Sequence, residues 1–240
     1  MKIQKYKKEL DYSYASGIFP TVELLLNRPE SVLEIILNSK ANDNEGILKI
    51  KDICRKKGIL LRVDDSSIGL ISSKENCYAA GVFKKYTTGL KAKKDHIVLV
   101  NPENAGNLGT IVRTMAGFKV TELALLRPAV DIFDPSVIRA SMGSIFKCNF
   151  SYFENFKEYS GEFKDREWYP FLTNGKNKLN ELEPASFGSY IFGGESSGLP
   201  EEFLHIGKSV VIPQSKEIDS LNLSIAVGIA LYQIFGGKKQ

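Results

Sequence analysis

The segment IVLVNPENAGNLGTIVRTMAG, residues 97–117, indicates the fold class of this chain. Its first four residues, Ile97–Val100, are all branched and apolar, and they predict a short buried strand. Apolar residues then recur at helical spacing, which predicts a helix over residues 104–117. A buried strand that runs through a short loop into a helix is the repeating unit of α/β proteins with a parallel sheet.

The rest of the second half repeats this alternation. Further strands are predicted at 121–126, 168–173, 189–193 and 209–212, and further helices at 134–141, 199–205 and 221–236. The pattern predicts a mostly parallel sheet that helices cover on both faces. Ligands of such sheets bind where the strands end, so the loops that follow the strands are the candidate sites.

Residues 1–90 predict a separate, small α/β unit. The polar and basic residues 91–94 form the predicted linker to a second domain at 95–240. Within the first unit a helix is expected to begin near Thr21 as its N-cap, and Gly69 and Gly81 are expected in turns. The remaining predicted elements are a strand at Val32–Leu37, a helix at Ile47–Lys57 that stops at Gly58, and a strand at Ile59–Val63.

Composition restricts the class of protein. Of 240 residues, 43% are apolar and 25% charged, which excludes a mainly disordered, collagen-like or coiled-coil chain. The longest apolar stretch, Ser224–Phe235, is too short to span a membrane, and no secretory signal is recognisable at the N-terminus. The three cysteines are far apart and predict buried free thiols in a reducing compartment, hence a cytoplasmic protein without a metal site.

Positive charge is clustered although the net charge is only +4. Clusters of this kind attract polyanions such as RNA, although solvated surface lysine explains any one cluster equally well. The clusters are Lys5, Lys7 and Lys8; Arg55, Lys56 and Lys57; Lys84, Lys85, Lys91, Lys93 and Lys94; and Lys238 and Lys239.

The first candidate loop runs from Asn101 to Arg113. With a helix start at Asn104, the residues Gly106, Gly109 and Arg113 are expected to share one helix face, opposite the apolar stripe. Such a face lets a ligand or another backbone approach closely beside a fixed cation. The alternative is a helix packed on its neighbour with Arg113 in a surface ion pair.

The second loop, Gly193–Gly198, also follows a strand and is rich in glycine. It contains G-x-S-x-G, the nucleophile elbow of serine hydrolases. That elbow requires an acid and then a histidine later in the chain. The two histidines, His96 and His205, do not supply this order, which nearly excludes a hydrolase and leaves a ligand loop or an ordinary turn.

The third loop, Ile212–Ser224, opens the last helix. Asp219 or Ser220 is expected to cap that helix. Because the helix is apolar all round and therefore buried, Asn222 and Ser224 in its first turn are expected to find polar partners. Capping alone is the competing explanation.

Together and in this order, the three loops resemble the SpoU/TrmH branch of the SPOUT RNA methyltransferases over about residues 95–240. The first matches N-x-x-N-x-G-x-x-x-R through Asn101, Asn104, Gly106 or Gly109, and Arg113. The second matches G-x-E-x-x-G through Gly193, Glu195 and Gly198. The third matches I-P…S-L-N-x-S through Ile212, Pro213, Ser220, Leu221, Asn222 and Ser224. Residues 1–90 resemble, more weakly, the small ribosomal-protein-like α/β/α domain that often precedes this catalytic domain and binds RNA.

The resemblance implies a deep trefoil knot in the α/β domain and transfer of a methyl group from S-adenosylmethionine to a ribose 2′-hydroxyl of RNA. The ribosomal-protein-like first domain favours ribosomal RNA, with transfer RNA as the alternative. It implies a homodimer with its active sites near the interface. The cofactor residues implied are Gly193, Ile212, Leu221, Thr173 and Gly198. The catalytic residues implied are Arg113, Asn104, Asn222, Glu195 and Ser220.

Within this set Arg113 is expected to stabilise the developing alkoxide or to orient it, because a neutral guanidine is too costly for a simple base. Asn104 and Asn222 would position Arg113 or the ribose, Ser220 would hydrogen-bond beside them, and Glu195 would hold the knot loop or the arginine. Gln214 and Lys216 depart from the family pattern of Met and Gly, so the cofactor loop is expected to follow a different path. Two alternatives share this scaffold: a non-catalytic RNA-binding protein and an enzyme that methylates a base.

Overall fold

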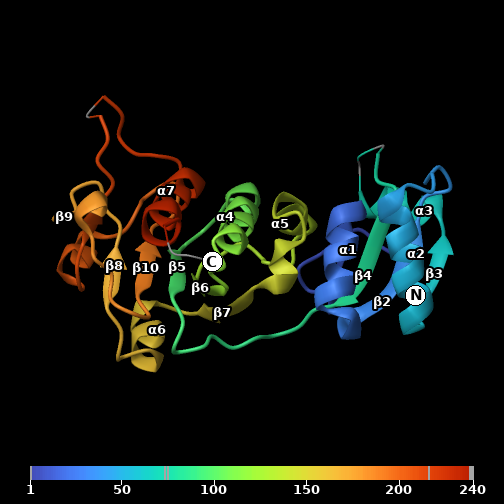
Figure 1. The fold of residues 1–240 in the computed structure, drawn as a ribbon, viewed down its shortest axis with the longest axis horizontal. Coiled ribbons are helices and arrows are strands. Elements are labelled where there is room, and N and C mark those ends of the chain that lie inside the picture. Colours follow the sequence, from blue (N-terminus) through green and yellow to red (C-terminus); the bar gives the residue numbers. More distant parts are fainter. Residues whose placement is uncertain (1, 73, 75, 216, 238–240) are drawn as a thin grey trace. The chain divides into compact units, whose positions relative to one another are not determined.

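The computed structural model describes residues 2–72, 74, 76–215 and 217–237, so Lys216, Lys238 and Lys239 lie outside the described residues. Tertiary contacts divide the chain into two compact units. The first comprises Met1–Tyr86 and Asp131–Lys147, and the second comprises Thr87–Val130 and Cys148–Gln240. Figure 1 labels most helices and strands of both.

The first unit is built on a four-stranded sheet in the order β1-β4-β2-β3. Strand β4 pairs antiparallel with β1 and β2, and β3 pairs parallel with β2. The strands are β1 (Tyr12–Ser16), β2 (Val32–Leu37), β3 (Leu61–Val63) and β4 (Ala79–Lys84). The helices are α1 (Ile18–Asn27), α2 (Glu45–Lys57), α3 (Asp65–Ile71) and α5 (Pro135–Ala140). Short 3-10 turns lie at η1 (Pro29–Ser31) and η2 (Ser144–Lys147).

Alternate residues of β2 enter two different cores, as expected for a strand that is covered on both faces. Ile35 and Leu37 pack with Leu25 and Ile50 of helices α1 and α2. Ile36 joins a second cluster that includes Ile68 of α3.

Two predicted elements of this unit are confirmed and three details are wrong. Strand β2 has the predicted limits, and α2 ends at Gly58 in the left-handed conformation. Thr21 is not an N-cap: α1 begins at Ile18, and the buried Thr21 hydroxyl donates to the Ala15 and Gly17 carbonyls. Gly69 lies within α3 and Gly81 within β4, so neither is in a turn. A Cβ on Gly81 would lie 2.6 Å from the Leu24 side chain, which explains the glycine by packing.

The second unit contains a five-stranded parallel sheet in the order β7-β6-β5-β10-β8. Helices α4 and α7 lie on one face and α6 lies on the other (Figure 1). The strands are β5 (His96–Val100), β6 (Glu122–Leu126), β7 (Asn149–Phe153), β8 (Trp168–Pro170) and β10 (Ser189–Phe192). The helices are α4 (Ala105–Gly117), α6 (Phe156–Glu162) and α7 (Leu223–Phe235), with 3-10 turns η3 (Leu179–Glu181) and η4 (Glu201–His205).

The parallel α/β prediction is confirmed, with local corrections. Strand β11 (Val210–Val211) pairs with β9 (Asn177–Lys178) in a separate two-stranded sheet. It meets the main sheet only where β8 has ended, through the Phe171–Val210 bridge. The predicted helix at 199–205 is the short 3-10 turn η4, and the predicted helix at 134–141 is α5 of the first unit. Strand β7 and helix α6 were not predicted.

All three cysteines are buried thiols, as predicted. No helix of the described chain is both long and apolar enough to cross a bilayer.

Candidate active site at the carboxyl end of the parallel sheet

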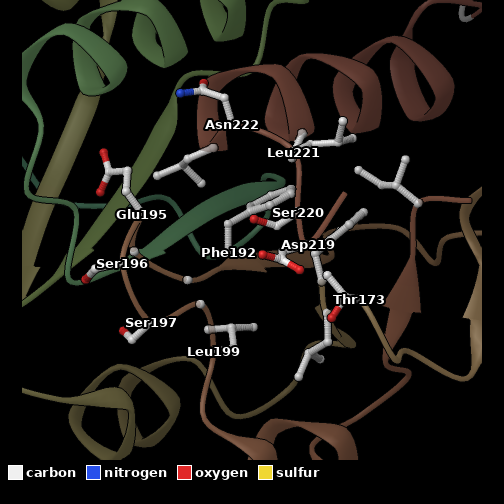
Figure 2. A pocket seen from close by; sticks show the side chains of 18 of the residues that line it. Thr173, Phe192, Glu195, Ser196, Ser197, Leu199, Asp219, Ser220, Leu221 and Asn222 are labelled. Carbon is white, nitrogen blue, oxygen red and sulfur yellow. The ribbon is translucent and has the colours of Figure 1, made fainter. Parts of the chain in front are cut away.

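A cavity of about 640 Å³ opens where β8 and β10 end. Its walls come from three loops, which are those that follow β8, β10 and β11, and from the first residues of α7 (Figure 2). Apolar side chains such as Phe171, Phe192 and Leu223 line it beside exposed backbone and polar groups. Its volume and mixed lining are those of a pocket for a nucleoside-sized ligand.

The structure brings together all five residues that were expected to hold the cofactor. Gly193, Ile212, Leu221, Thr173 and Gly198 all line the cavity. They come from three separate loops, so their convergence is a property of the fold and not of local sequence.

The glycine loop after β10 is closely packed against its own backbone. A Cβ on Gly193 would lie 2.0 Å from the carbonyl carbon of Gly198, and a Cβ on Gly194 would lie 2.5 Å from the Asn101 carbonyl oxygen. Gly198 itself has a φ of 63°, which other residues rarely adopt. The amide of Gly198 donates to the Gly194 carbonyl at 3.1 Å and closes the loop. Side chains are therefore excluded at Gly193 and Gly194, and a ligand in the cavity meets bare backbone at Gly193, Gly194 and Gly198.

The start of α4 is hydrogen-bonded to this glycine loop. Asn104 is the N-cap of α4, and its side chain accepts from the Asn107 amide at 3.0 Å. The Asn107 side chain donates to Glu195 Oε1 at 2.9 Å, and the amide of Glu103 donates to Glu195 Oε2 at 3.3 Å. Partial burial raises the pKa of Glu195, but the hydrogen bonds from Asn107 and Glu103 outweigh it, so the pKa lies below the ordinary value. Glu195 is thus held as an anion at the cavity edge.

Asn222 completes a chain of hydrogen-bonded side chains that joins the glycine loop after β10, the start of α4 and the start of α7. It caps α7 by accepting from the amide of Ser224 at 2.9 Å and from its hydroxyl at 2.7 Å. Its amide nitrogen donates to Asn107 Oδ1 at 3.3 Å. Asn107 therefore bridges Glu195 and Asn222, a role that sequence reasoning missed because an asparagine inside a helix carries no signal of a tertiary partner.

The cap of α7 was predicted incorrectly. Neither Asp219 nor Ser220 caps the helix, because Asn222 stands directly before its first turn and fills that position. Both residues line the cavity instead.

Arg113 lies further along α4 and does not line the cavity. Its side chain is exposed and makes no hydrogen bond or ion pair with another described residue, so the alternative of a surface ion pair within the chain fails. The shared helix face is only partly confirmed: Gly106 is exposed with Arg113, but Gly109 is buried with Leu108 and Ile111. Three residues advance a helix by about 300°, which is less than a full turn, so Gly109 is rotated away from Gly106 and toward the core.

The histidine that starts β5 belongs to a buried network at the other end of the strand. His96 Nδ1 lies 3.0 Å from the Tyr159 hydroxyl, and Nε2 lies 3.0 Å from the Lys91 carbonyl oxygen. Burial, reinforced by the Arg166 cation, lowers the pKa of His96 to about 4. Because β5 separates it from the glycine loop, His96 cannot serve Ser196 as a base, in agreement with the exclusion of a serine hydrolase.

No group of three or more His, Cys, Asp or Glu side chains in the described chain is placed to hold a metal ion.

Comparison with known proteins identifies relatives of this architecture. The model of the SpoU rRNA methylase family matches residues 94–232. A 23S rRNA (adenosine(1067)-2′-O)-methyltransferase from Streptomyces laurentii is 28% identical over 192 residues, which cover 75% of this chain and 71% of that protein. A ribosomal RNA small subunit methyltransferase G 2 from Syntrophobacter fumaroxidans is 33% identical over 138 residues, 56% of this chain but only 26% of that relative's length.

The fold is shared along nearly the whole chain. The AdoMet-bound rRNA methyltransferase from Sinorhizobium meliloti superposes with a TM-score of 0.80 and covers 96% of this chain and 89% of its own, at 21% identity.

Proposed function

We propose, because this chain belongs to the SpoU rRNA methylase family, that it transfers the methyl group of S-adenosylmethionine to a ribose 2′-hydroxyl of RNA. The family consists of S-adenosylmethionine-dependent RNA methyltransferases. One observation carries the proposal furthest: the hydrogen-bonded chain Glu195–Asn107–Asn222 links the three motif loops at the rim of one cavity.

Some residues at the cavity would hold the cofactor, and others would fix the loops around it. Gly193, Ile212 and Leu221 would hold the cofactor mainly through backbone groups, with Thr173 and Gly198 beside them. Bound there, S-adenosylmethionine supplies an electrophilic methyl group. Glu195 and Asn222, fixed by Asn107, would keep the loops at the correct spacing so that the acceptor oxygen approaches in line. Asn104, which caps α4, would fix the start of the helix that carries Arg113.

The transfer requires loss of one proton. The 2′-oxygen would form a bond to the methyl carbon as the S–C bond breaks with its electron pair retained by sulfur, and the hydroxyl proton would pass to solvent water. Arg113 has no partner among the described residues and is therefore available to the RNA, from the same subunit or from a second one. We assign to it stabilisation of the developing negative charge on the 2′-oxygen, with Ser220 hydrogen-bonding in the same region.

We propose that residues 1–90 bind the RNA substrate, that 91–94 link the domains and that 95–240 form the catalytic domain, although Asp131–Lys147 belong to the first compact unit. Lys85 Nζ donates to the Lys8 carbonyl at 2.8 Å, so the basic segment Lys5–Lys8 lies beside the end of β4. Exposed Lys5, Lys7 and Lys8 thereby gather near exposed Lys84, a surface suited to phosphates. Lys85 does not belong to this surface, since its ammonium is 3.1 Å from Asp131 and its side chain is only 16% exposed.

Further family features complete the proposal. A homodimer is supported by exposed apolar residues on one side of α7, Ile225, Ile229 and Tyr232. A deep trefoil knot is proposed around the loops Gly193–Gly198 and Ile212–Leu221, whose convergence on the cavity supports it. We further propose a cytoplasmic enzyme whose RNA is ribosomal in preference to transfer RNA.

A filter-binding assay with S-adenosylmethionine labelled in its methyl group tests the proposal. The wild-type protein is expected to place label in RNA, and heat-denatured protein is the control. Normal RNA affinity without any transfer of label, despite bound cofactor, would instead favour a non-catalytic RNA-binding protein.

A further inference from the structure

The charges on the described lining of the cavity are all negative. Its described lining contains three carboxylates, Glu195, Glu201 and Asp219, and neither lysine nor arginine. Glu195 is already engaged by Asn107 and by the backbone of Glu103. All three carboxylates give the cavity a negative potential, and Glu201 and Asp219 are the two that no other described residue engages.

Asp219 is the better placed of the two. Figure 2 shows its carboxylate directed toward the interior of the ring of labelled side chains that surround the cavity. It forms no hydrogen bond or ion pair with another described residue, and it does not cap α7. A carboxylate that serves neither the helix nor a neighbouring cation is free to act on a ligand.

We propose that Asp219, supported by Glu201, makes the cavity discriminate between S-adenosylmethionine and its demethylated product by charge. This rests on the proposed function. The amino-acid ends of the two molecules are identical, so they differ only in the sulfonium, which is positive before transfer and a neutral thioether afterwards. A carboxylate facing the cavity attracts the additional positive charge of the sulfonium, which the thioether lacks.

The effect is limited by solvent. Both carboxylates are exposed in the open cavity, so water and salt weaken their attraction for a cation. We expect loss of the Asp219 charge to lower affinity for the cationic ligand by about fivefold, an amount typical of one partly screened charge pair. Because the thioether carries no charge, affinity for the product should change less than twofold.

Calorimetric titration of the full-length protein tests this with three ligands: S-adenosylmethionine, S-adenosylhomocysteine and sinefungin, which carries a protonated amine in place of the methyl sulfonium. The variants are Asp219→Asn and Glu201→Gln. Glu202→Gln is the matched control, since Glu202 is its exposed neighbour on η4 and does not line the cavity. Asp219→Asn should lower the affinity for S-adenosylmethionine and sinefungin about fivefold at low salt and by less at high salt. Glu201→Gln should have a smaller effect, and Glu202→Gln should leave the affinities unchanged.

An equal loss for all three ligands in Asp219→Asn would overturn the inference, because it would indicate a role in loop shape. Unchanged binding of the cations would overturn it as well. Failure of the wild-type protein to bind any of the three ligands would instead contradict the proposed function, and the inference with it.

Discussion

Arg113 is the residue whose substitution should slow methyl transfer without weakening cofactor binding. It stands exposed on α4, outside the cavity lining. We expect Arg113→Ala to lower kcat by about 100-fold, the usual effect of removing one group that stabilises an oxyanion, while affinity for S-adenosylmethionine stays within twofold. Arg113→Lys should recover part of the rate, since it restores the charge without the fork geometry.

Steady-state kinetics on RNA and calorimetry on the cofactor measure the two effects. The matched control is Lys157→Ala, an exposed cation on α6. A wild-type rate in Arg113→Ala would contradict the assignment.

Asn107 is expected to matter because it bridges two loops. Asn107→Ala removes the hydrogen bonds to Glu195 and Asn222 and should lower the free energy of unfolding by about 1 kcal/mol. The loosened rim should lower kcat about tenfold. Asn180→Ala, at an exposed asparagine that bonds no other described residue, should leave both quantities unchanged. Chemical denaturation and initial rates measure them, and equal behaviour of the two variants would remove Asn107 from the site.

Individual cavity residues could be anticipated from the sequence to an unequal extent. The glycine-rich loop after a predicted strand pointed to Gly193, whereas Ile212 and Leu221 were implied only by the family resemblance; all three line the cavity. Asn107 could not be anticipated, because its importance comes from Glu195 and Asn222, which are 88 and 115 positions away in the chain.

At the level of elements, the start of β5 makes stability depend on pH. His96 is buried, and its pKa is lowered from 6.5 to about 4. Between pH 6.5 and pH 4 the imidazole of His96 binds a proton in the unfolded chain but not in the folded chain. The stability that depends on neutral His96 is therefore complete above pH 6.5 and is lost as the pH falls toward 4. The loss attributable to His96 should reach about 3 kcal/mol at pH 4.

Denaturation of the wild-type protein from pH 7 to pH 4 measures this loss. His96→Gln should flatten that part of the slope, and His205→Gln, at an exposed histidine, should not. Where His96→Gln fails to fold, an NMR titration of the wild-type imidazole replaces it, and a midpoint near 6.5 would contradict the prediction.

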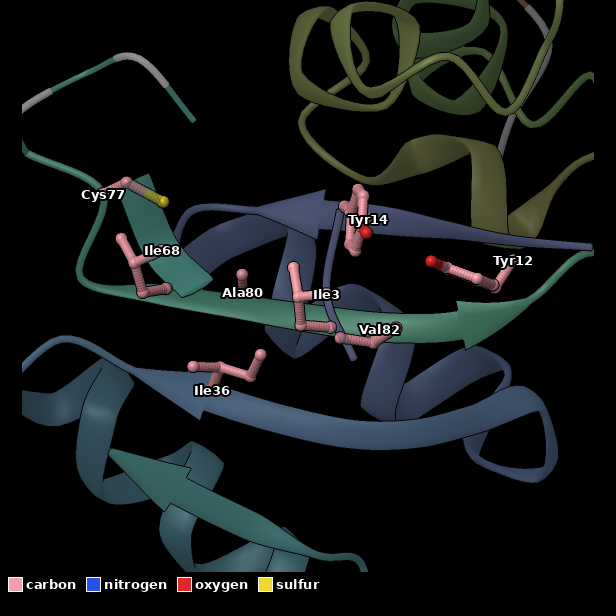
Figure 3. Packing of buried hydrophobic residues seen from close by; sticks show 8 residues of the cluster. All are labelled: Ile3, Tyr12, Tyr14, Ile36, Ile68, Cys77, Ala80 and Val82. Atoms are coloured by element: carbon pink, nitrogen blue, oxygen red, sulfur yellow. The ribbon is translucent and has the colours of Figure 1, made fainter. Parts of the chain in front are cut away.

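Elements with strong local signals were predicted well, and elements defined by partners were not. Strand β2 and helix α2 carry clear periodicity and a glycine stop. Strands β1 and β4 were missed because small and polar residues interrupt their pattern; they are strands because Tyr12, Tyr14 and Val82 pack over one face of the sheet (Figure 3). Strand β11 lies within the strand predicted at 209–212, but its pairing with the two-residue strand β9 in a separate sheet was not predicted.

At the scale of the whole molecule, α7 is expected to form the subunit interface. Ile225, Ile229 and Tyr232 are 54%, 39% and 69% exposed and recur at helical spacing on one side of the helix. A lysine there would have to be buried without a partner on association, so Ile229→Lys should convert a dimer to a monomer. Leu48→Lys, at an exposed leucine of α2, is the control. Light scattering after gel filtration measures the mass, and a monomeric wild-type protein would contradict the prediction.

The central claim is that a ribose 2′-oxygen accepts the methyl group, and identifying the methylated nucleoside tests it most directly. RNA from a host that lacks the modification, incubated with the protein and labelled S-adenosylmethionine, is digested to nucleosides and separated by chromatography. We predict label in a 2′-O-methyl nucleoside, appearing about 100-fold more slowly after Arg113→Ala. Label on a base would retain the fold, the cavity and the cofactor but would contradict the ribose as the acceptor.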